Sequence, residues 1–447
     1  MNSTVAAIAS APGVGAVSLI RVSGPEAVEI CGKLLRCKLG IENSAERYAT
    51  LCKVVTADDV VIDEVLATVF KNPRSFTGED VVELACHGGV LVTRRVLERI
   101  LDCGARSAEP GEFSRRAFEN GKMDLTQAEG IMDLISAQTD LAMRAAHEQM
   151  QGKLGDQSED LREMLIGVVA HVEAFIDFPD EDIDPDTGAA MLKRIDEVLA
   201  GIDKMLATAE QGRILREGVR TVICGEPNVG KSSLLNGLLG YERAIVSDIE
   251  GTTRDTVEEV VNIQGIPLRL IDTAGVRSSE DVIEMKGIER SEKQIELADL
   301  IIEVVDGSKA SERLLTDEMI GKRSHILVIN KNDLGVSDKW SGADGVKISC
   351  SSEGGLETLG EVIADTLMLS ENAWGGHAVA INARHQECLK RGRVALVAAR
   401  ESLEIGVGAE FSALDLRDAV EAIGEVAGRV DTEEIFDAIF GAFCIGK

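Results

Sequence analysis

The sequence is poor in aromatic residues and in positive charge. Phe, Trp and Tyr make up only 3% of its 447 residues, so we do not expect the base-stacking surfaces of proteins that bind single-stranded nucleic acid. The formal net charge is −30, which argues against a broad surface for nucleic acid. Any contact with RNA should therefore depend on local clusters of arginine and lysine.

The sequence also lacks the cysteine spacing of metal ribbons and disulfide-rich domains. None of its nine cysteines lies in a C-x-x-C pair. Residues 1–20 are apolar but are interrupted by Pro12, Gly13 and Gly15, which is not typical of a signal or transit peptide. No stretch is long and apolar enough to cross a membrane. We therefore expect a cytoplasmic protein with reduced thiols and no membrane partner.

A phosphate-binding loop is the strongest positive signal. Residues 225–232 read GEPNVGKS and fit the pattern G-x-x-x-x-G-K-S, with a strand predicted before them and leucines at helical spacing after them. Loop N–H groups and the helix N-terminus bind phosphate oxygens in such motifs, and the flanking elements disfavour a purely structural glycine turn. We expect Lys231 to contact the β- and γ-phosphates and Ser232 to bind Mg²⁺. The predicted nucleotide contacts are Asn228, Val229, Gly230, Lys231, Ser232 and Ser233.

A second motif selects the base. Asn330-Lys331-Asn332-Asp333 follows an apolar strand predicted over residues 326–329. A carboxylate at Asp333 accepts two hydrogen bonds from guanine, whereas adenine would leave it unpaired at a cost of roughly 1–3 kcal/mol. Alone this string is common on protein surfaces, but downstream of a phosphate loop it favours GTP, with Asn330 bracing the loop. The loop expected to close over the base contains Ser349, Cys350 and Ser351.

Two further loops complete the predicted GTP site. Asp272-Thr273-Ala274-Gly275 follows a predicted strand, so Asp272 is expected in the Mg²⁺ shell and the Gly275 N–H at the γ-phosphate. Upstream, a threonine hydroxyl of residues 251–255 completes the Mg²⁺ coordination. The predicted contacts from these loops are Ser247, Asp248, Ile249, Glu250, Gly251, Thr252, Asp272, Thr273, Ala274 and Gly275.

The residue after the D-x-x-G motif is Val276, where Ras-like switches carry a glutamine that orients the attacking water. Hydrolysis therefore needs another group that positions water and another source of positive charge. Glu284 is a candidate for the first, and a solvated helix carboxylate is the alternative interpretation of that residue. A monovalent cation bound by the amide oxygen of Asn228 is a candidate for the second.

The hydrophobic periodicity changes along the chain and predicts several domains. Residues 1–120 are expected to be mixed α/β, with strands over residues 4–10, 15–22, 60–70 and 80–85 and a helix over residues 90–101. Residues 121–216 and 371–447 are expected to be helical, and residues 217–370 form the inserted nucleotide domain. Periodicity does not show whether the two helical parts pack together. The acidic break at residues 177–186 is more typical of a helix connector than of a metal loop.

Beyond these motifs, the sequence resembles the MnmE/TrmE family of tRNA-modification GTPases over nearly its whole length. The signatures that carry the resemblance lie at residues 20–25, 76–80, 83–89, 110–118, 120–122 and 444–447. The resemblance implies a multidomain α/β and α protein. An N-terminal folate-binding-like domain, similar to those of aminomethyltransferases, forms a constitutive homodimer, and a central helical domain carries an inserted Ras-like P-loop GTPase domain.

The resemblance also assigns roles to matching positions. Those for 5-formyl- or 5,10-methylene-tetrahydrofolate are Arg21, Glu83, Lys122 and Lys447. A carboxylate accepts paired N–H donors of a pterin, and cationic side chains meet its anionic tail. For K⁺-dependent hydrolysis activated by dimerisation, the K⁺ positions are Asn228, Ser247, Ile249 and Thr252, and the Mg²⁺ ligands are Ser232 and Thr253. The expected catalytic residues are Glu284, Lys231 and Cys444, the last as either a nucleophile or a positioning residue.

Two functions remain to be compared. In the first, implied by the resemblance, the chain hydrolyses GTP and works with a MnmG/GidA-family FAD protein in a heterotetramer. Together they add a carboxymethylaminomethyl or aminomethyl group to C5 of the wobble uridine of certain tRNAs, while GTP turnover moves the two G domains. In the alternative, the chain is a GTP-dependent ribosome-assembly switch without covalent chemistry. Such proteins usually append a basic RNA-binding module, whereas this C-terminal part is helical and not basic.

Overall fold

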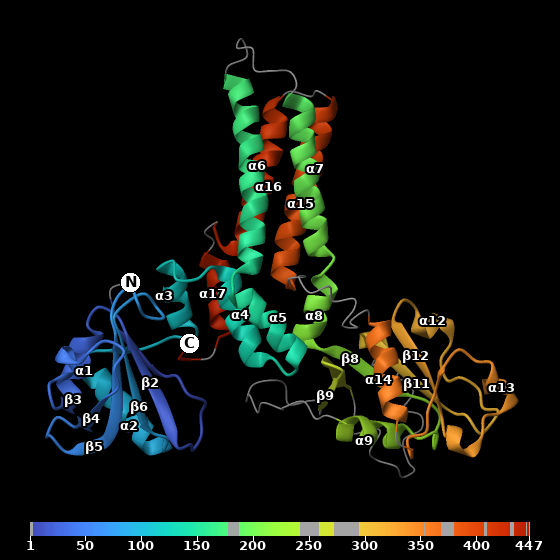
Figure 1. Cartoon of the computed structure of the whole chain (residues 1–447), viewed down its shortest axis with the longest axis horizontal. Coiled ribbons are helices and arrows are strands. Elements are labelled where there is room, and N and C mark those ends of the chain that lie inside the picture. Colours follow the sequence, from blue (N-terminus) through green and yellow to red (C-terminus); the bar gives the residue numbers. More distant parts are fainter. Residues whose placement is uncertain are drawn as a thin grey trace. The chain divides into compact units, whose positions relative to one another are not determined.

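The computed structural model describes residues 3–177, 187–241, 259–271, 295–352, 354–367, 380–405, 409–429, 433–443 and 445–446. The chain forms two compact units (Figure 1). The first contains Met1–Met132 and Gly424–Lys447, and the second contains Asp133–Ile423. The last residues of the chain therefore pack with the N-terminal unit, whereas the periodicity grouped them with the preceding helices.

A seven-stranded sheet forms the centre of the first unit. Its order is β3-β4-β5-β6-β2-β1-β7, and all neighbours are antiparallel except β1 and β7. The strands are β1 (Val5–Ile8), β2 (Val17–Ser23), β3 (Leu35–Cys37), β4 (Thr50–Val55), β5 (Val61–Phe70), β6 (Val81–His87) and β7 (Arg106–Ser107). In β5, Val65, Ala67 and Val69 are buried while Glu64 and Leu66 are exposed. This alternation is expected for a sheet with one covered face.

Helices cover that face of the sheet. Side chains of α1 (Ala27–Leu34) and α2 (Val90–Asp102), including Ile30, Val96 and Ile100, join the core formed by the strands. The remaining described helical segments of this unit are η1 (Ile41–Asn43), α3 (Glu112–Glu119), the start of α4 (Leu125–Ser136), the end of α16 (Ala409–Ala427) and α17 (Glu433–Gly441). The rings of Phe118 and Phe436 lie 5.0 Å apart, so the C-terminal helix shares a core with α3.

The expectation of reduced thiols is wrong for Cys37 and Cys52, which form a disulfide. Their strands β3 and β4 are antiparallel, and the register places the two residues opposite each other with Cα atoms 4.4 Å apart. Neither β3 nor β4 was predicted from the sequence, so their register and the resulting pair could not be anticipated. The six other cysteines that the structure describes are free.

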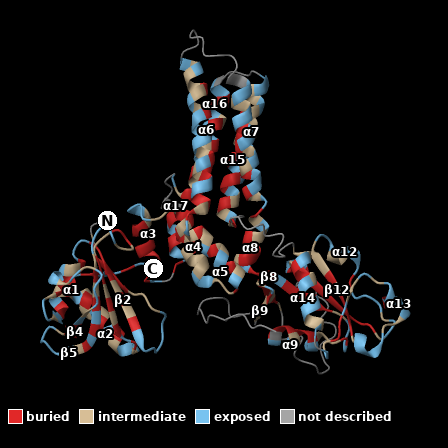
Figure 2. Cartoon of the chain, in the orientation of Figure 1, coloured by how far each residue is buried: buried red, intermediate tan, exposed pale blue. Residues whose placement is uncertain are grey.

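The helices of the second unit include α5 (Asp140–Met150), α6 (Lys153–Asp177), α7 (Thr187–Leu206), α8 (Ala209–Glu217), α15 (Ala383–Ile405) and the larger part of α16 (Ala409–Ala427). Their buried residues lie on the sides that face one another (Figure 2). Arg393 and Arg400 of α15 each bond an aspartate of α7 at 2.7 Å, and Arg417 of α16 bonds Glu173 of α6. The helical segments before and after the nucleotide domain therefore pack together. No helix in the described part of the chain is long and apolar enough to cross a bilayer.

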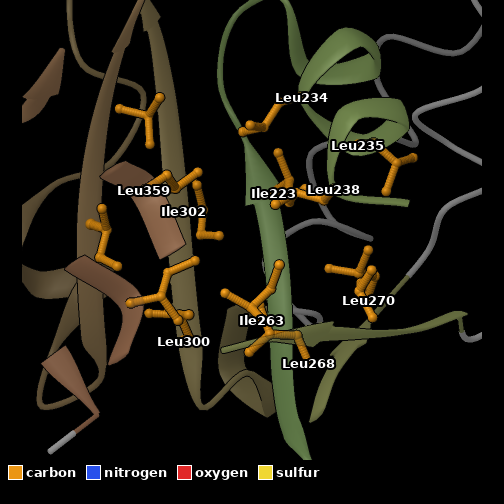
Figure 3. Close-up of a cluster of buried hydrophobic side chains, with 14 of the residues drawn as sticks. Ile223, Leu234, Leu235, Leu238, Ile263, Leu268, Leu270, Leu300, Ile302 and Leu359 are labelled. Atoms are coloured by element: carbon orange, nitrogen blue, oxygen red, sulfur yellow. The ribbon is translucent and has the colours of Figure 1, made fainter. Parts of the chain in front are cut away.

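The nucleotide domain contains a six-stranded sheet of order β13-β12-β11-β8-β10-β9 within the described residues. Its strands are β8 (Val219–Cys224), β9 (Glu259–Ile263), β10 (Ile266–Leu270), β11 (Leu300–Asp306), β12 (Ser324–Asn330) and β13 (Val346–Lys347). The described helices are α9 (Lys231–Tyr241), α12 (Asp317–Ile320), η2 (Asn332–Leu334), α13 (Asp338–Ser341) and α14 (Gly355–Thr366). Figure 3 shows the core that holds α9 to the sheet, with Leu234 and Leu238 beside Ile223.

All neighbouring strands of this sheet are parallel except β9 and β10. The carboxyl ends of β8, β11, β12 and β13 therefore meet at one edge, where open α/β sheets bind ligands. The predicted phosphate and base motifs all follow these strand ends.

Candidate functional site

The loop of residues 225–230 joins β8 to α9 and passes close to β11. Gly225 has φ +146° and Gly230 has φ +105°, so both adopt backbone conformations that favour glycine. A Cβ atom on Gly225 would clash with the carbonyl oxygen of Val304. Because α9 begins at Lys231, the positive end of its dipole faces the loop, as an anion site requires.

Lys231 folds back over this loop. Its Nζ donates hydrogen bonds to the carbonyl oxygens of Gly225 and Glu226, each at 2.8 Å. Burial lowers the pKa of the Lys231 ammonium below its usual value. The Lys231 ammonium is therefore held beside the loop by two neutral carbonyl oxygens. A charged phosphate oxygen is a stronger acceptor and can replace them.

Asn330 connects the phosphate loop to the loop after β13. Its Nδ2 donates to the carbonyl oxygen of Val229 at 2.9 Å, and its Oδ1 accepts from the backbone N–H of Cys350 at 3.2 Å. The side chain is 2% exposed, so both bonds lie in the interior. Asn330 was predicted to brace a loop, and the structure adds the partner that the sequence did not predict, Val229, 101 residues away in the sequence.

Lys331 makes a second connection at the same edge. Its Nζ donates to the carbonyl oxygen of Asn228 at 2.7 Å and to Oδ2 of Asp306 at 2.8 Å. Asp306 ends β11, and sequence reasoning did not select it. The sequence feature that could have identified Asp306 is an acidic residue at the end of a largely apolar strand, at the sheet edge where the nucleotide motifs lie.

The residues predicted to read the base follow the ends of β12 and β13. Asp333 is exposed within η2, and the neighbouring Asn332 N–H donates to the carbonyl oxygen of Ile348 at 3.1 Å. Ser349 is buried, and its Oγ accepts from the N–H of Ser351 at 3.3 Å. Backbone bonds therefore hold the two predicted base loops side by side.

Several predicted site residues lie outside the described residues. They are Ser247, Asp248, Ile249, Glu250, Gly251, Thr252, Thr253, Asp272, Thr273, Ala274, Gly275, Glu284, Cys444 and Lys447. Of the proposed Mg²⁺ and K⁺ ligands, the structure describes Ser232 and Asn228. The described part of the chain contains no cluster of three metal-ligating His, Cys, Asp or Glu side chains.

In the N-terminal unit, two of the predicted folate residues contact each other. Arg21 and Glu83 are register partners on β2 and β6, and their side chains pair through Nε at 2.9 Å and Nη2 at 2.8 Å. The Arg21 guanidinium lies 5.0 Å from the ring centroid of Phe76 and 5.6 Å from that of Phe113. A charged pair beside two aromatic rings provides both hydrogen-bonding groups and an apolar surface for a planar ring.

Lys122 and the C-terminal segment lie elsewhere in the same unit. The exposed Lys122 Nζ donates to the carbonyl oxygen of Pro73 at 3.0 Å, and Ile445 forms a β-bridge with Pro110. Gly446 has φ +99°, and a Cβ there would clash with the carbonyl oxygen of Ile8 in β1. The C-terminal segment therefore lies against β1, the neighbour of the strand that carries Arg21.

A buried ion network, which sequence reasoning missed, joins two of the N-terminal signatures. Arg116 is 1% exposed and bonds Oε2 of Glu79 at 2.9 Å and Oε1 of Glu112 at 2.8 Å. Glu79 also accepts from Ser23 Oγ at 2.8 Å. These charged residues fix the loop that carries Phe76, one of the two rings beside Arg21.

The chain is similar to known proteins over its whole length. A family model described as the MnmE helical domain matches residues 125–444, and one described as the GTP-binding protein TrmE N-terminus matches residues 4–122. The tRNA modification GTPase MnmE of Akkermansia muciniphila is 49% identical, with 99% of each chain covered. The protein of the same name from Geobacter sulfurreducens is 44% identical, with 100% of each chain covered. Among solved structures, the FeoB G-domain from Methanococcus jannaschii matches 33% of this chain and 97% of its own length, at 26% identity and a TM-score of 0.25.

Proposed function

The chain belongs to the MnmE family of tRNA modification GTPases. We propose that it binds and hydrolyses GTP at one site assembled around Asn330, and that this hydrolysis drives the modification of tRNA wobble uridines. The observation that carries this proposal is the pair of bonds by which Asn330 joins the phosphate loop to the loop after β13. A single ligand that spans both loops has phosphates at one end and a base at the other.

The phosphate end uses the loop amides, the α9 N-terminus and Lys231. Lys231 exchanges its two carbonyl partners for oxygens of the β- and γ-phosphates. Ser232 and Thr253 would hold Mg²⁺, and Asn228 and neighbouring positions would hold K⁺. The two ions would supply positive charge where negative charge develops during hydrolysis. Glu284 orients the attacking water in place of the missing glutamine.

The base end uses Asp333. Its carboxylate accepts from guanine N1–H and the 2-amino group, while Ser349, Cys350 and Ser351 close over the ring. The bond from Asn332 to Ile348 holds the η2 turn to the start of the loop after β13, so both loops present a stable edge to the base. This arrangement selects GTP over ATP.

The one-carbon chemistry belongs to the N-terminal unit. Glu83 accepts the paired N–H donors of a tetrahydrofolate, Arg21 meets its ring oxygens or acidic tail, and Phe76 and Phe113 supply apolar contact. Lys122 and Lys447 contribute further positive charge. The carbon carried by the folate, together with nitrogen from glycine or ammonium, becomes the new C5 substituent, and an FAD protein of the MnmG/GidA family supplies the redox step.

A second copy of the chain covers the open face of the N-terminal sheet. Leu51 on β4 and Leu66 on β5 are register partners, 65% and 48% exposed, and Ala85 lies opposite Leu66 on β6. Ala85 is two residues from Glu83 and shares its face, so the apolar row continues toward the proposed folate residues. This supports a homodimer in which the sheet face and the folate site are neighbours.

The alternative of a ribosome-assembly switch has weaker support. The full-length relatives are named tRNA modification GTPases, and the match extends through the N-terminal unit, which a simple GTPase switch does not need. The two functions predict different products. Only the first changes the chemical structure of a tRNA base.

The decisive experiment is nucleoside mass spectrometry of tRNA from cells that carry this chain, lack its gene, or produce variants. We expect loss of the modified wobble uridine on deletion and after Lys231→Ala or Glu83→Gln, with full modification in the exposed control Gly342→Ala. Wobble uridines that stay fully modified in the deletion strain would refute the proposal.

The cation mechanism is tested on the purified protein by GTP turnover in KCl and in NaCl. We expect strong stimulation by K⁺, and a large loss of turnover in Asn228→Ala and Glu284→Ala but not in Gly342→Ala. Equal turnover in the two salts would remove K⁺ from the mechanism while leaving the GTP site in place.

A further inference from the structure

The carboxylate of Asp306 is the centre of a small buried ion network that the proposed mechanism does not use. Asp306 is 4% exposed, and its Oδ1 accepts from the N–H and Oγ of Ser308 at 3.1 and 2.6 Å. Its Oδ2 accepts from Lys331 Nζ at 2.8 Å, while the exposed Lys309 Nζ lies 3.9 Å away. A buried carboxylate with this many directed donors has a fixed orientation.

The charge on Asp306 persists at neutral pH. Burial acts to raise the pKa of this carboxyl, but donation from Lys331 and Ser308 holds the pKa below its usual value. Asp306 and Lys331 therefore form an ion pair rather than a neutral hydrogen bond.

Lys331 transmits the position of Asp306 to the phosphate loop. Its ammonium also donates to the carbonyl oxygen of Asn228 at 2.7 Å. Asn228 and Lys331 have φ +62° and +61°, a left-handed conformation that is uncommon for residues with a Cβ atom. One ammonium thus ties together two strained backbone positions, one in the phosphate loop and one in the base loop.

We infer that Asp306 is a positioning residue for nucleotide and monovalent-cation binding. It holds the Lys331 ammonium so that Asn228 and the base loop keep the spacing that a guanine nucleotide requires. This inference rests on the proposed nucleotide site, because Asn228 and Lys331 matter only if the ligand contacts them. Asp306 is buried and bonded to Lys331 and Ser308, so in this inference it acts through the lysine rather than by contact with the ligand.

The test compares Asp306→Asn with Lys309→Gln, which removes the exposed lysine near the same carboxylate but leaves the pair with Lys331. We expect Asp306→Asn to raise the Kd of a fluorescent GTP analogue about tenfold and to raise the K⁺ concentration for half-maximal turnover. The maximal turnover at saturating GTP and K⁺ should change much less, and Lys309→Gln should match the unmodified chain. An unchanged Kd and K⁺ response in folded Asp306→Asn would overturn the inference.

A double-mutant cycle with Lys331→Met separates positioning from general loss of structure. If Asp306 acts through Lys331, then Asp306→Asn should add almost nothing to the rise in Kd caused by Lys331→Met. Additive effects would overturn the inference. Should circular dichroism show that Asp306→Asn does not fold, Asp306→Glu replaces it in both experiments, with a smaller rise in Kd expected and an unchanged Kd contradicting the inference. Failure of the unmodified chain to prefer GTP over ATP would instead refute the nucleotide site itself.

Discussion

Replacement of Gly230 by alanine tests whether the contact between the phosphate loop and Asn330 organises the nucleotide domain. Gly230 has φ +105°, and an added Cβ would occupy the position of Asn330 Nδ2. The asparagine side chain cannot move aside without losing its bonds to Val229 and Cys350. The methyl group therefore separates the two loops that form the proposed nucleotide site.

The size of the effect is the sum of two contributions. A non-glycine residue in this backbone conformation costs roughly 1–3 kcal/mol. Two hydrogen bonds of the buried Asn330 amide contribute about 1 kcal/mol each. We expect Gly230→Ala to lower the free energy of unfolding of the nucleotide domain by roughly 3–5 kcal/mol.

Urea denaturation followed by the fluorescence of the buried Trp340 measures this change. The matched control is Gly342→Ala, because Gly342 is exposed, has φ −103° and has open space around its Cβ position. An unfolding free energy for Gly230→Ala within 1 kcal/mol of the control, combined with normal GTP binding, would refute the reasoning.

Three further predictions address other parts of the chain. Glu303 is buried and accepts hydrogen bonds from Arg313 and His325, each at 3.0 Å. Burial acts to raise the pKa of the Glu303 carboxyl, but these donors hold that pKa below 4.5, so the stabilisation is present above pH 4.5 and is lost as the pH falls through the lower pKa of the folded state. Glu303→Gln should therefore lower the free energy of unfolding by roughly 2 kcal/mol at pH 7 and make that free energy less dependent on pH during acid denaturation. Arg21→Ala should weaken tetrahydrofolate binding about tenfold or more in calorimetry, and unchanged affinity would exclude the pair with Glu83 from that site. Because we propose that the exposed Leu66 lies in a dimer interface, Leu66→Lys should give a monomer in analytical ultracentrifugation, and a dimer of unchanged stability would place the interface elsewhere.

The sequence predicted elements whose signal is local. The strand before the phosphate loop and the leucine spacing after it correspond to β8 and α9, and the predicted Leu234, Leu235, Leu238 and Leu239 are all buried. Strands β1, β2, β5 and β6 and helix α2 were predicted within a few residues of their bounds. The six-residue strand β4 was not predicted. Strands β3 and β7 were missed because runs of three and two residues carry too little periodicity to recognise.

What depended on contacts distant in sequence was not predictable. The bond from Asn330 to Val229 and the ion pair of Arg116 with Glu79 follow from the packing of whole elements. The Cys37–Cys52 disulfide needs a strand register, and the bridge between Pro110 and Ile445 joins residues that are far apart in the sequence. Asp306 is the most instructive miss, because its role depends on a lysine 25 residues away on a neighbouring strand end.

We propose that the loops joined by Asn330 form one site that reads guanine, which calorimetric titration of nucleotide-free protein with GTP and with ATP can test. GTP should bind roughly 10- to 100-fold more tightly than ATP, because adenine leaves the Asp333 carboxylate without its donors. Equal affinities for the two nucleotides would contradict it.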